Sequence, residues 1–194
     1  MARYFVDSNL VVYANDRRDP EKQARALEVL TQLMTAGNGV LSIQVLQEYA
    51  NTALAKLEQE PQVVIRQIKL LDCLTTIAPS PASVRRTVEV RNTYRISFWD
   101  AAIVVAAEAG ECDIILSEDL NAGQYYAGIQ VANPFGEGFD TSAVDLAVFA
   151  GTPEWAGTVT APLVDALLAA GTATLYLGLS AFEGVGALSY EELP

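Results

Sequence analysis

Short apolar runs alternate along the chain with longer stretches in which apolar residues recur every three or four positions. The longer stretches predict helices, several of them bounded by breakers such as Pro20, Gly37 and Pro61. The short runs predict buried strands, which we expect at residues 4–6, 40–43, 75–78, 113–116 and 128–131. Strands that alternate with helices in this way predict right-handed βαβ units. The pattern therefore indicates an α/β fold around a mostly parallel sheet.

The alternation stops at Pro134-Phe-Gly136-Glu-Gly138, which is typical of a domain boundary. We therefore expect one domain over residues 1–135 and a C-terminal extension over residues 136–194. The extension is acidic and rich in Ala and Gly. Inside it, only a helix around 161–169 and a strand around 173–179 are suggested by the pattern.

The amino-acid composition argues against several classes of protein and of catalytic site. The 51% apolar content argues against disorder. The chain shows neither an apolar run of the roughly eighteen residues that a membrane span needs nor a secretory leader, so we expect a soluble cytoplasmic protein. Histidine is absent, which excludes Ser-His-Asp and Cys-His catalysis and histidine-based zinc sites. Cys73 and Cys112 are expected to be small core residues, because two isolated cysteines build neither a disulfide framework nor a zinc site.

Charge is distributed unevenly along the chain. Residues 1–95 hold all 12 Lys and Arg and 10 Asp and Glu, whereas residues 96–194 hold 14 acidic residues and no basic one. The net charge of −12 argues against broad nonspecific binding of nucleic acid, which normally needs a basic surface. A metal ion bound by carboxylates would supply positive charge locally.

Four carboxylates stand where predicted strands end or predicted helices begin: Asp7, Glu48, Asp100 and Asp119. Asp7 and Asp119 each follow an apolar strand, so parallel neighbours would bring both to the crevice where α/β sheets bind ligands. Asp100 opens a buried helix, where an unpaired carboxylate is costly unless it caps the helix or binds a cation. Because Mg²⁺ and Mn²⁺ prefer oxygen ligands, we interpret the four as converging on one or two divalent ions.

Each carboxylate also has an ordinary structural explanation. Asp7 is a residue type that caps helices, and the Ser97-x-x-Asp100 spacing resembles a capping box. Glu48 is compatible with a solvated helix position and Asp119 with a turn after a strand. Taken singly, these explanations are at least as good as a metal site, so the metal hypothesis depends on the four residues together.

The segments around these acids also resemble a known family, the PIN-domain nucleases. Four segments are similar to its acidic motifs in order and spacing: Phe5-Val-Asp7-Ser8-Asn9, Gln47-Glu48, Phe98-Trp99-Asp100-Ala101-Ala102 and Leu116-Ser117-Glu118-Asp119-Leu120. The similarity is closest to toxins of the VapBC toxin–antitoxin type. It covers residues 3–135, including a Val131-Ala-Asn-Pro-Phe135 segment near which such toxins often end. It implies a three-layer α/β/α fold of the PIN kind.

The resemblance further implies an Mg²⁺- or Mn²⁺-dependent endoribonuclease in which a metal-bound water attacks the RNA phosphodiester. The implied metal ligands are Asp7, Glu48, Asp100 and Asp119, with hydrogen-bonding support from Asn9 and Ser117. Glu118 is an alternative to Asp119 as the fourth acid. Members of the family usually form homodimers and are held inactive by a cognate antitoxin.

Two other functions stay open: a PIN-like RNA-processing nuclease outside toxin–antitoxin systems, and a catalytically silent binding module. A neighbouring antitoxin gene would separate the first from a toxin, and the second predicts no metal binding. A phosphohydrolase of the haloacid dehalogenase kind is disfavoured, because Asp7-Ser8-Asn9 lacks a second Asp two positions after the first. The extension is the departure from the family pattern, and its acidic composition indicates that it does not enlarge an RNA surface.

Overall fold

The computed structural model of the protein describes residues 2–139. Within this range the fold is α/β, as the alternating pattern predicts. The helix and strand expected around 161–169 and 173–179 lie outside the described residues. The division into domains at residue 135 stays a prediction.

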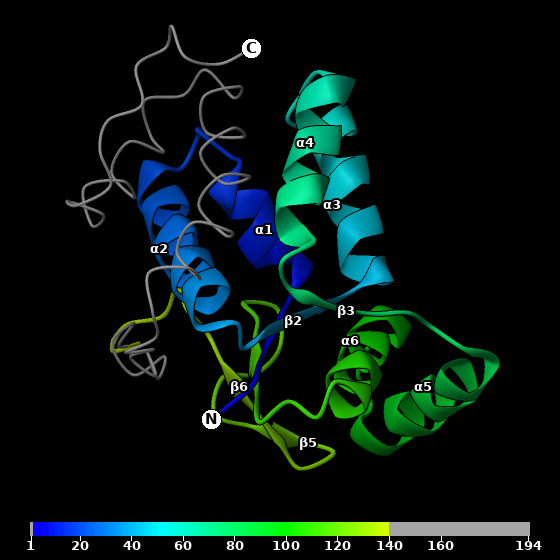
Figure 1. Ribbon diagram of the computed structural model, residues 1–194. Coiled ribbons are helices and arrows are strands. Elements are labelled where there is room, and N and C mark those ends of the chain that lie inside the picture. Colours follow the sequence, from blue (N-terminus) through cyan, green and yellow to red (C-terminus); the bar gives the residue numbers. More distant parts are fainter. Residues whose placement is uncertain (1, 140–194) are drawn as a thin grey trace, which may run out of the picture. The chain divides into compact units, whose positions relative to one another are not determined.

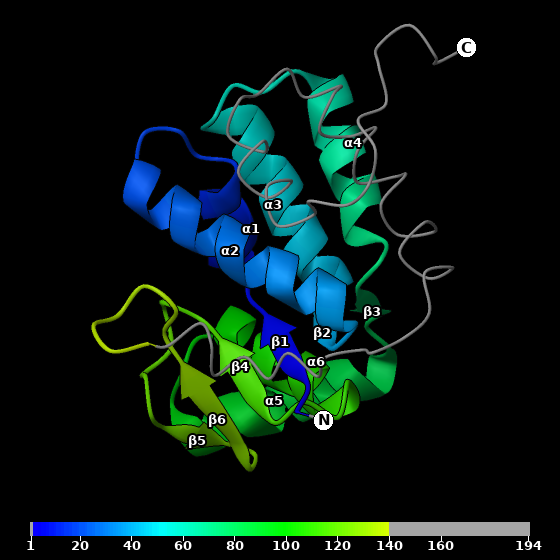
Figure 2. The same cartoon turned by 60° about the vertical axis from the view of Figure 1, so that its left-hand side comes forward.

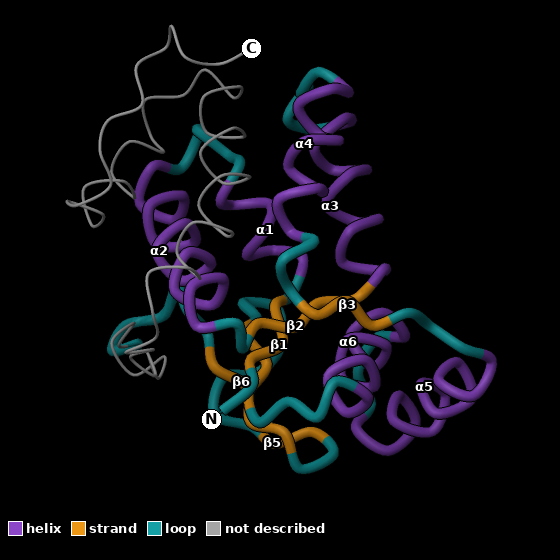
Figure 3. The backbone as a smooth tube through the Cα atoms, viewed as in Figure 1, coloured by secondary structure: helices purple, strands orange, loops and turns teal. Residues whose placement is uncertain are grey.

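A six-stranded sheet forms the centre of the described part (Figures 1 and 3). Its order is β3-β2-β1-β4-β6-β5, and all neighbours are parallel except β5 and β6. The strands are β1 (Tyr4–Val6), β2 (Gly39–Ser42), β3 (Thr75–Ile77), β4 (Ile114–Leu116), β5 (Tyr125–Tyr126) and β6 (Ile129–Ala132).

Helices cover both faces of this sheet, as Figure 2 shows: α1 to α4 lie on one side, and α5 and α6 on the other. Their bounds are α1 (Ser8–Ala14), α2 (Pro20–Ala36), α3 (Ile43–Ala55), α4 (Pro61–Leu71), α5 (Pro81–Tyr94) and α6 (Phe98–Ala109). Breakers set several of these limits. Proline opens α2, α4 and α5, and Gly37 ends α2 with a φ of 64°, in the left-handed region that glycine adopts without strain.

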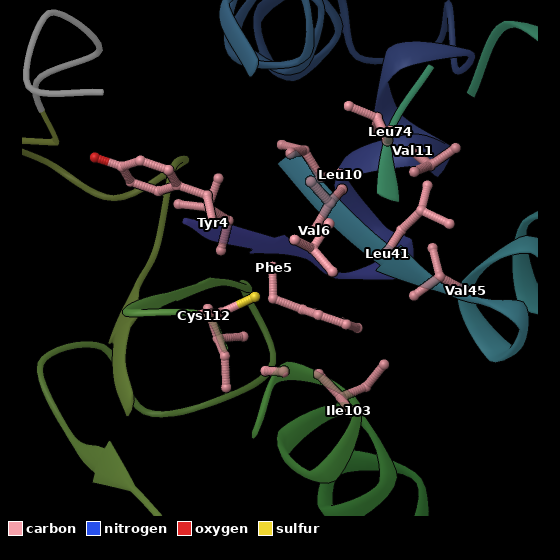
Figure 4. Close-up of a cluster of buried hydrophobic side chains, with 14 of the residues drawn as sticks. Tyr4, Phe5, Val6, Leu10, Val11, Leu41, Val45, Leu74, Ile103 and Cys112 are labelled. Atoms are coloured by element: carbon pink, nitrogen blue, oxygen red, sulfur yellow. The ribbon is translucent and has the colours of Figure 1, made fainter. Parts of the chain in front are cut away.

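The core packs against both faces of β1, whose three residues are buried. Successive side chains of a strand point to opposite faces, so a strand covered on both sides must be apolar throughout. Figure 4 shows the result: Phe5 points toward Ile103 of α6, whereas Val6 lies with Leu10 of α1 on the other face. This double burial explains why the run Tyr4–Val6 is continuously apolar and does not alternate.

Strand order reverses direction next to β1. From β1 the chain proceeds to β2 and β3 on one side, and then crosses to β4 and β6 on the other. A crevice forms at such a switch point, outside the carboxyl ends of the two strands that flank it. Here these strands are β1 and β4, with Val6 opposite Leu116. The residues that follow them, Asp7 and Ser117, therefore lie side by side.

Three expectations from the sequence need correction. The short strand β5 was not expected; it pairs with β6 through a turn at Ala127 and Gly128, whose φ angles of 50° and 86° suit a tight hairpin. Cys73 is exposed and not part of the core, whereas Cys112 is buried as expected. The helix α6, expected to be buried, exposes Trp99 at its start. Separately, among residues 2–139 no helix is long and apolar enough to cross a membrane.

Candidate active site

Asp7 lies at the switch point, between β1 and α1, and only 6% of its surface is exposed. One carboxylate oxygen, Oδ1, accepts a hydrogen bond of 2.6 Å from the Ser8 backbone N–H, which makes Asp7 the N-cap of α1. The other oxygen, Oδ2, accepts 2.6 Å from the Ser117 hydroxyl and 3.2 Å from the Asn9 side-chain amide. The capping explanation of Asp7 thus accounts for one oxygen, whereas the other is bound by Ser117 and Asn9.

Ser117 and Asn9 connect Asp7 to Asp119. The fully buried Ser117 Oγ donates to Asp7 and accepts from the backbone N–H groups of Asp119 at 3.1 Å and Leu120 at 3.3 Å. The Asn9 Nδ2 donates to Asp7 and, at 3.4 Å, to Asp119 Oδ2. One amide nitrogen therefore spans both carboxylates, and the turn after β4 is held against the end of β1.

Glu48 and the start of α6 meet through Gln44. The Gln44 Nε2 donates 2.9 Å to Glu48 Oε1, one turn along α3, and 3.3 Å to the Trp99 carbonyl oxygen. Glu48 itself is half-buried. Asp100 follows Trp99, and its backbone N–H donates 3.0 Å to Ser97 Oγ, the N-cap of α6. Ser97 therefore caps this helix through the Asp100 backbone, and no capping bond between described residues involves the Asp100 carboxylate.

Burial raises the pKa of Asp7 to about 6 from its ordinary 3.8. The hydrogen bonds from Ser117 and Ser8 work in the opposite direction, while the negative charges of Asp119 and Glu48 raise the pKa further. All donors to Asp7 in the described part of the chain are uncharged groups. A buried carboxylate with like charges nearby and no cationic partner binds its proton unusually tightly, and would exchange it for a cation.

Glu118 has a different environment from Asp119. Both of its oxygens contact Lys22 Nζ, at 2.6 and 2.8 Å, and Tyr13 OH donates 2.7 Å to one of them. Partial burial raises the pKa of Glu118, but these hydrogen bonds outweigh it and leave the pKa below its usual value. Since Glu118 is already paired and Asp119 is bridged to Asp7, the geometry favours Asp119 over Glu118 as the fourth acid.

Of the four predicted carboxylates, the structure joins Asp7 and Asp119 through Asn9, while within residues 2–139 no hydrogen bond joins the Asp100 carboxylate to the other three. Asp7 and Asp119 share the Asn9 amide, and Glu48 is near enough to affect the Asp7 carboxyl group, while Asp100 is linked to Glu48 only through Gln44 and Trp99. Within residues 2–139, no group of three or more acidic or cysteine side chains is close enough to form a metal site as it stands. The assignment of all four as metal ligands stays a prediction.

The residues nevertheless fit a divalent cation in their chemistry. The available donors are carboxylate and amide oxygens, the types that Mg²⁺ and Mn²⁺ prefer. Asn9 Oδ1 is buried without a hydrogen-bond partner among the described residues. Buried polar atoms are usually satisfied, so an orphaned oxygen beside two carboxylates indicates a missing ligand such as water or a cation.

Two residues that organise this site, Gln44 and Lys22, were not predicted from the sequence. Gln44 had a detectable signal, because Gln and Glu four residues apart on a helix are neighbours on its surface. Lys22 had none: its partner Glu118 is 96 positions away, and only the packing of α2 against α1 and the β4 loop brings them together.

A comparison with models of known protein families agrees with this geometry. A sequence model of the PIN domain matches residues 4–127, more than half of the chain, and this range contains all four acids. PIN domains are in general metal-dependent nucleases that act on nucleic acid. The comparison with curated proteins finds no match to the chain. From the family match, the strand order and the acids at the switch point, we conclude that the chain belongs to the PIN-domain family.

Proposed function

We propose that this protein is a metal-dependent endoribonuclease that hydrolyses RNA phosphodiesters. The observation that supports this most strongly is Asp7, a buried carboxylate bound only by uncharged donors, among the described residues, beside Asp119. Burying an ionised carboxylate without a cationic partner is costly. A capping role explains only one of its oxygens, whereas cation binding explains both the burial and the orphaned Asn9 oxygen.

The proposed ligands are Asp7, Glu48, Asp100 and Asp119, which would hold Mg²⁺ or Mn²⁺. When bound, the ion would supply Lewis-acid polarisation of the phosphate and activation of a water. Ser117 fixes the Asp7 rotamer by its 2.6 Å hydrogen bond and positions the Asp119 backbone. Gln44 ties Glu48 to the start of α6. These contacts hold ligands in orientation, as outer hydrogen bonds do in metal sites generally.

We further propose that the protein is the toxin of a toxin–antitoxin pair, acting in the cytoplasm as a homodimer and inhibited by a cognate antitoxin. This proposal rests on the resemblance of the acidic motifs to VapBC toxins. An RNA-processing role for the same nuclease is the competing possibility. Co-expression distinguishes them: a toxin arrests growth when produced alone, and the small protein encoded beside it restores growth.

Cleavage of RNA by the purified full-length chain tests the catalytic proposal. We expect cleavage of a mixed tRNA and mRNA pool with Mg²⁺ or Mn²⁺, and loss of cleavage with EDTA or in Asp7→Asn and Asp119→Asn. Asp72→Asn, which changes an exposed carboxylate at the end of α4, is the matched control and should retain activity. Absence of cleavage together with absence of Mn²⁺ binding by calorimetry would refute the proposal and favour a silent binding module.

The same assay decides the fourth acid. Glu118→Gln should keep most of the cleavage rate, because Glu118 is engaged by Lys22 and Tyr13. If Glu118→Gln abolishes cleavage and Asp119→Asn does not, the fourth ligand is Glu118.

A further inference from the structure

Trp99 is the most exposed large hydrophobic side chain in the described part of the chain, with 62% of its surface exposed. Tryptophan offers one of the largest apolar surfaces of any residue, and burial of that surface is strongly favourable. Phe98 packs against it edge to face, with ring centroids 5.4 Å apart. This contact orients the indole ring and leaves most of it to solvent.

The position of Trp99 links it to the acidic site. It directly precedes Asp100, and its carbonyl oxygen accepts a hydrogen bond from the same Gln44 amide that binds Glu48. Of the four predicted ligands, Asp100 is therefore the immediate neighbour of Trp99 in the chain, and Glu48 shares its hydrogen-bond partner Gln44. An exposed aromatic residue next to a predicted metal ligand suits a substrate that carries flat, apolar faces as well as phosphates.

Arginine side chains that form no ion pair with a described residue lie in the segment just before Trp99. The stretch from Arg85 to Arg95, which forms most of α5 and its C-cap, holds four arginines and one glutamate. Arg86 binds Glu89 and Glu108, whereas Arg91 and Arg95 are exposed and form no ion pair with a described residue. Arg95 lies four residues before Trp99, in the short connection to α6. In an otherwise acidic protein, this arrangement offers phosphates a local positive charge.

We propose that Trp99 stacks on an unpaired nucleobase of single-stranded RNA beside the acidic site, while Arg91 and Arg95 contact the adjoining phosphates. The inference rests on the proposed ribonuclease function and assigns the residues that would hold the substrate beside the acidic site. Stacking needs a free base face, which a duplex does not offer because each base is covered by its neighbours. Stacking is also tolerant of base identity, since every base has such a face.

Steady-state cleavage of a single-stranded oligoribonucleotide provides the first test. Trp99→Ala should lower kcat/KM roughly 5- to 150-fold, the range that loss of one base–aromatic stack predicts. Trp99→Phe should restore most of the loss because it retains a stacking ring. Tyr125→Ala is the matched control: Tyr125 is also 58% exposed but lies on the edge strand β5, beyond β6 from β4, and its removal should have no effect.

Salt dependence separates stacking from charge. Arg95→Gln should reduce the slope of log affinity against log salt by about 0.7, the value for one phosphate contact on a single strand. Trp99→Ala should leave this slope unchanged, because a stack releases no counterions. A duplex of the same sequence should show no sensitivity to Trp99→Ala.

Fluorescence provides a measurement that does not need turnover. The chain has two tryptophans, so Trp155→Phe leaves Trp99 as the only one. Single-stranded RNA should quench this signal and duplex RNA should not. Cleavage with an unchanged rate in Trp99→Ala and no quenching would overturn the stacking proposal while supporting the nuclease. Quenching without metal-dependent cleavage and without Mn²⁺ binding would support stacking and refute the nuclease.

Discussion

Asp7→Asn should stabilise the metal-free protein at neutral pH, although it should abolish activity. Asn is close in shape to a protonated Asp, so the change removes the buried charge while largely preserving the packing. With its amide oxygen in place of Oδ2, the new side chain still accepts from the Ser117 hydroxyl and the Asn9 amide, and only the bond from the Ser8 N–H is lost. What disappears is the cost of ionising a group that is 6% exposed and lies near Asp119 and Glu48.

The magnitude follows from the pKa of Asp7, which burial raises from 3.8 to about 6. A shift of this size corresponds to about 3 kcal/mol of unfolding free energy. Between pH 3.8 and about pH 6, Asp7 in the folded protein retains a proton that it has lost in the unfolded chain. Wild-type stability should therefore fall as pH rises from about 4 to about 6 and then level off, whereas Asp7→Asn should lack this decline.

Urea denaturation in EDTA between pH 4 and pH 8 measures the difference. The two proteins should have similar unfolding free energies near pH 4, and the variant should gain up to about 3 kcal/mol above pH 6. Asp72→Asn should follow the wild type, because Asp72 is exposed. Added Mg²⁺ should stabilise the wild type more than the variant. A variant that is no more stable than the wild type at pH 7.5 would refute the claim that Asp7 is buried as an uncompensated charge.

Three further substitutions probe the contacts around the site. Gln44→Ala should weaken Mn²⁺ binding about 10-fold or more in calorimetry, because Glu48 loses the bond that orients it; unchanged affinity would exclude this role. Lys22→Met should lower the unfolding free energy in urea denaturation by about 1 kcal/mol, since it leaves Glu118 without its counterion. This loss should be smaller in high salt, and an equal loss at low and high salt would contradict an ionic origin. Ser117→Ala should lower the cleavage rate about 10- to 100-fold, and a smaller effect would show that Ser117 does not hold the carboxylate in place.

The elements that sequence patterns predicted are those with strong local signals. The helices α2, α4 and α5 open with proline, and β1 and β4 are short apolar runs that end at polar residues, so their existence follows from local chemistry. The edge strand β5 has two residues and depends on its pairing with β6, a tertiary contact that periodicity does not encode. Cys73 was misplaced because an apolar neighbourhood in sequence does not fix which side of the turn after α4 faces solvent.

The site was predictable to the extent that topology determines it. Asp7 and Asp119 were expected together because parallel neighbouring strands end at one edge, and the register of β1 and β4 produces this proximity. The links that complete it come from residues with weaker signals. Gln44 reaches the Trp99 carbonyl across 55 positions, and Lys22 reaches Glu118 across 96. Such contacts depend on how helices pack and cannot be predicted from the spacing of motifs.

If the protein were a silent binding module, Asp7 would serve only as the N-cap of α1, and its surroundings do not fit that role alone. An N-cap needs one side-chain oxygen, and Ser or Asn supplies it without placing a charge in the interior. At this position a carboxylate is buried, its second oxygen faces Ser117 and Asn9, and further acids stand nearby. The cost of that arrangement is recovered only when a cation binds, because the cation interacts with the ionised form alone. A protein with no need for the cation would be more stable with Asn at this position, so a stabilising Asp7→Asn substitution is itself evidence for a function at the site.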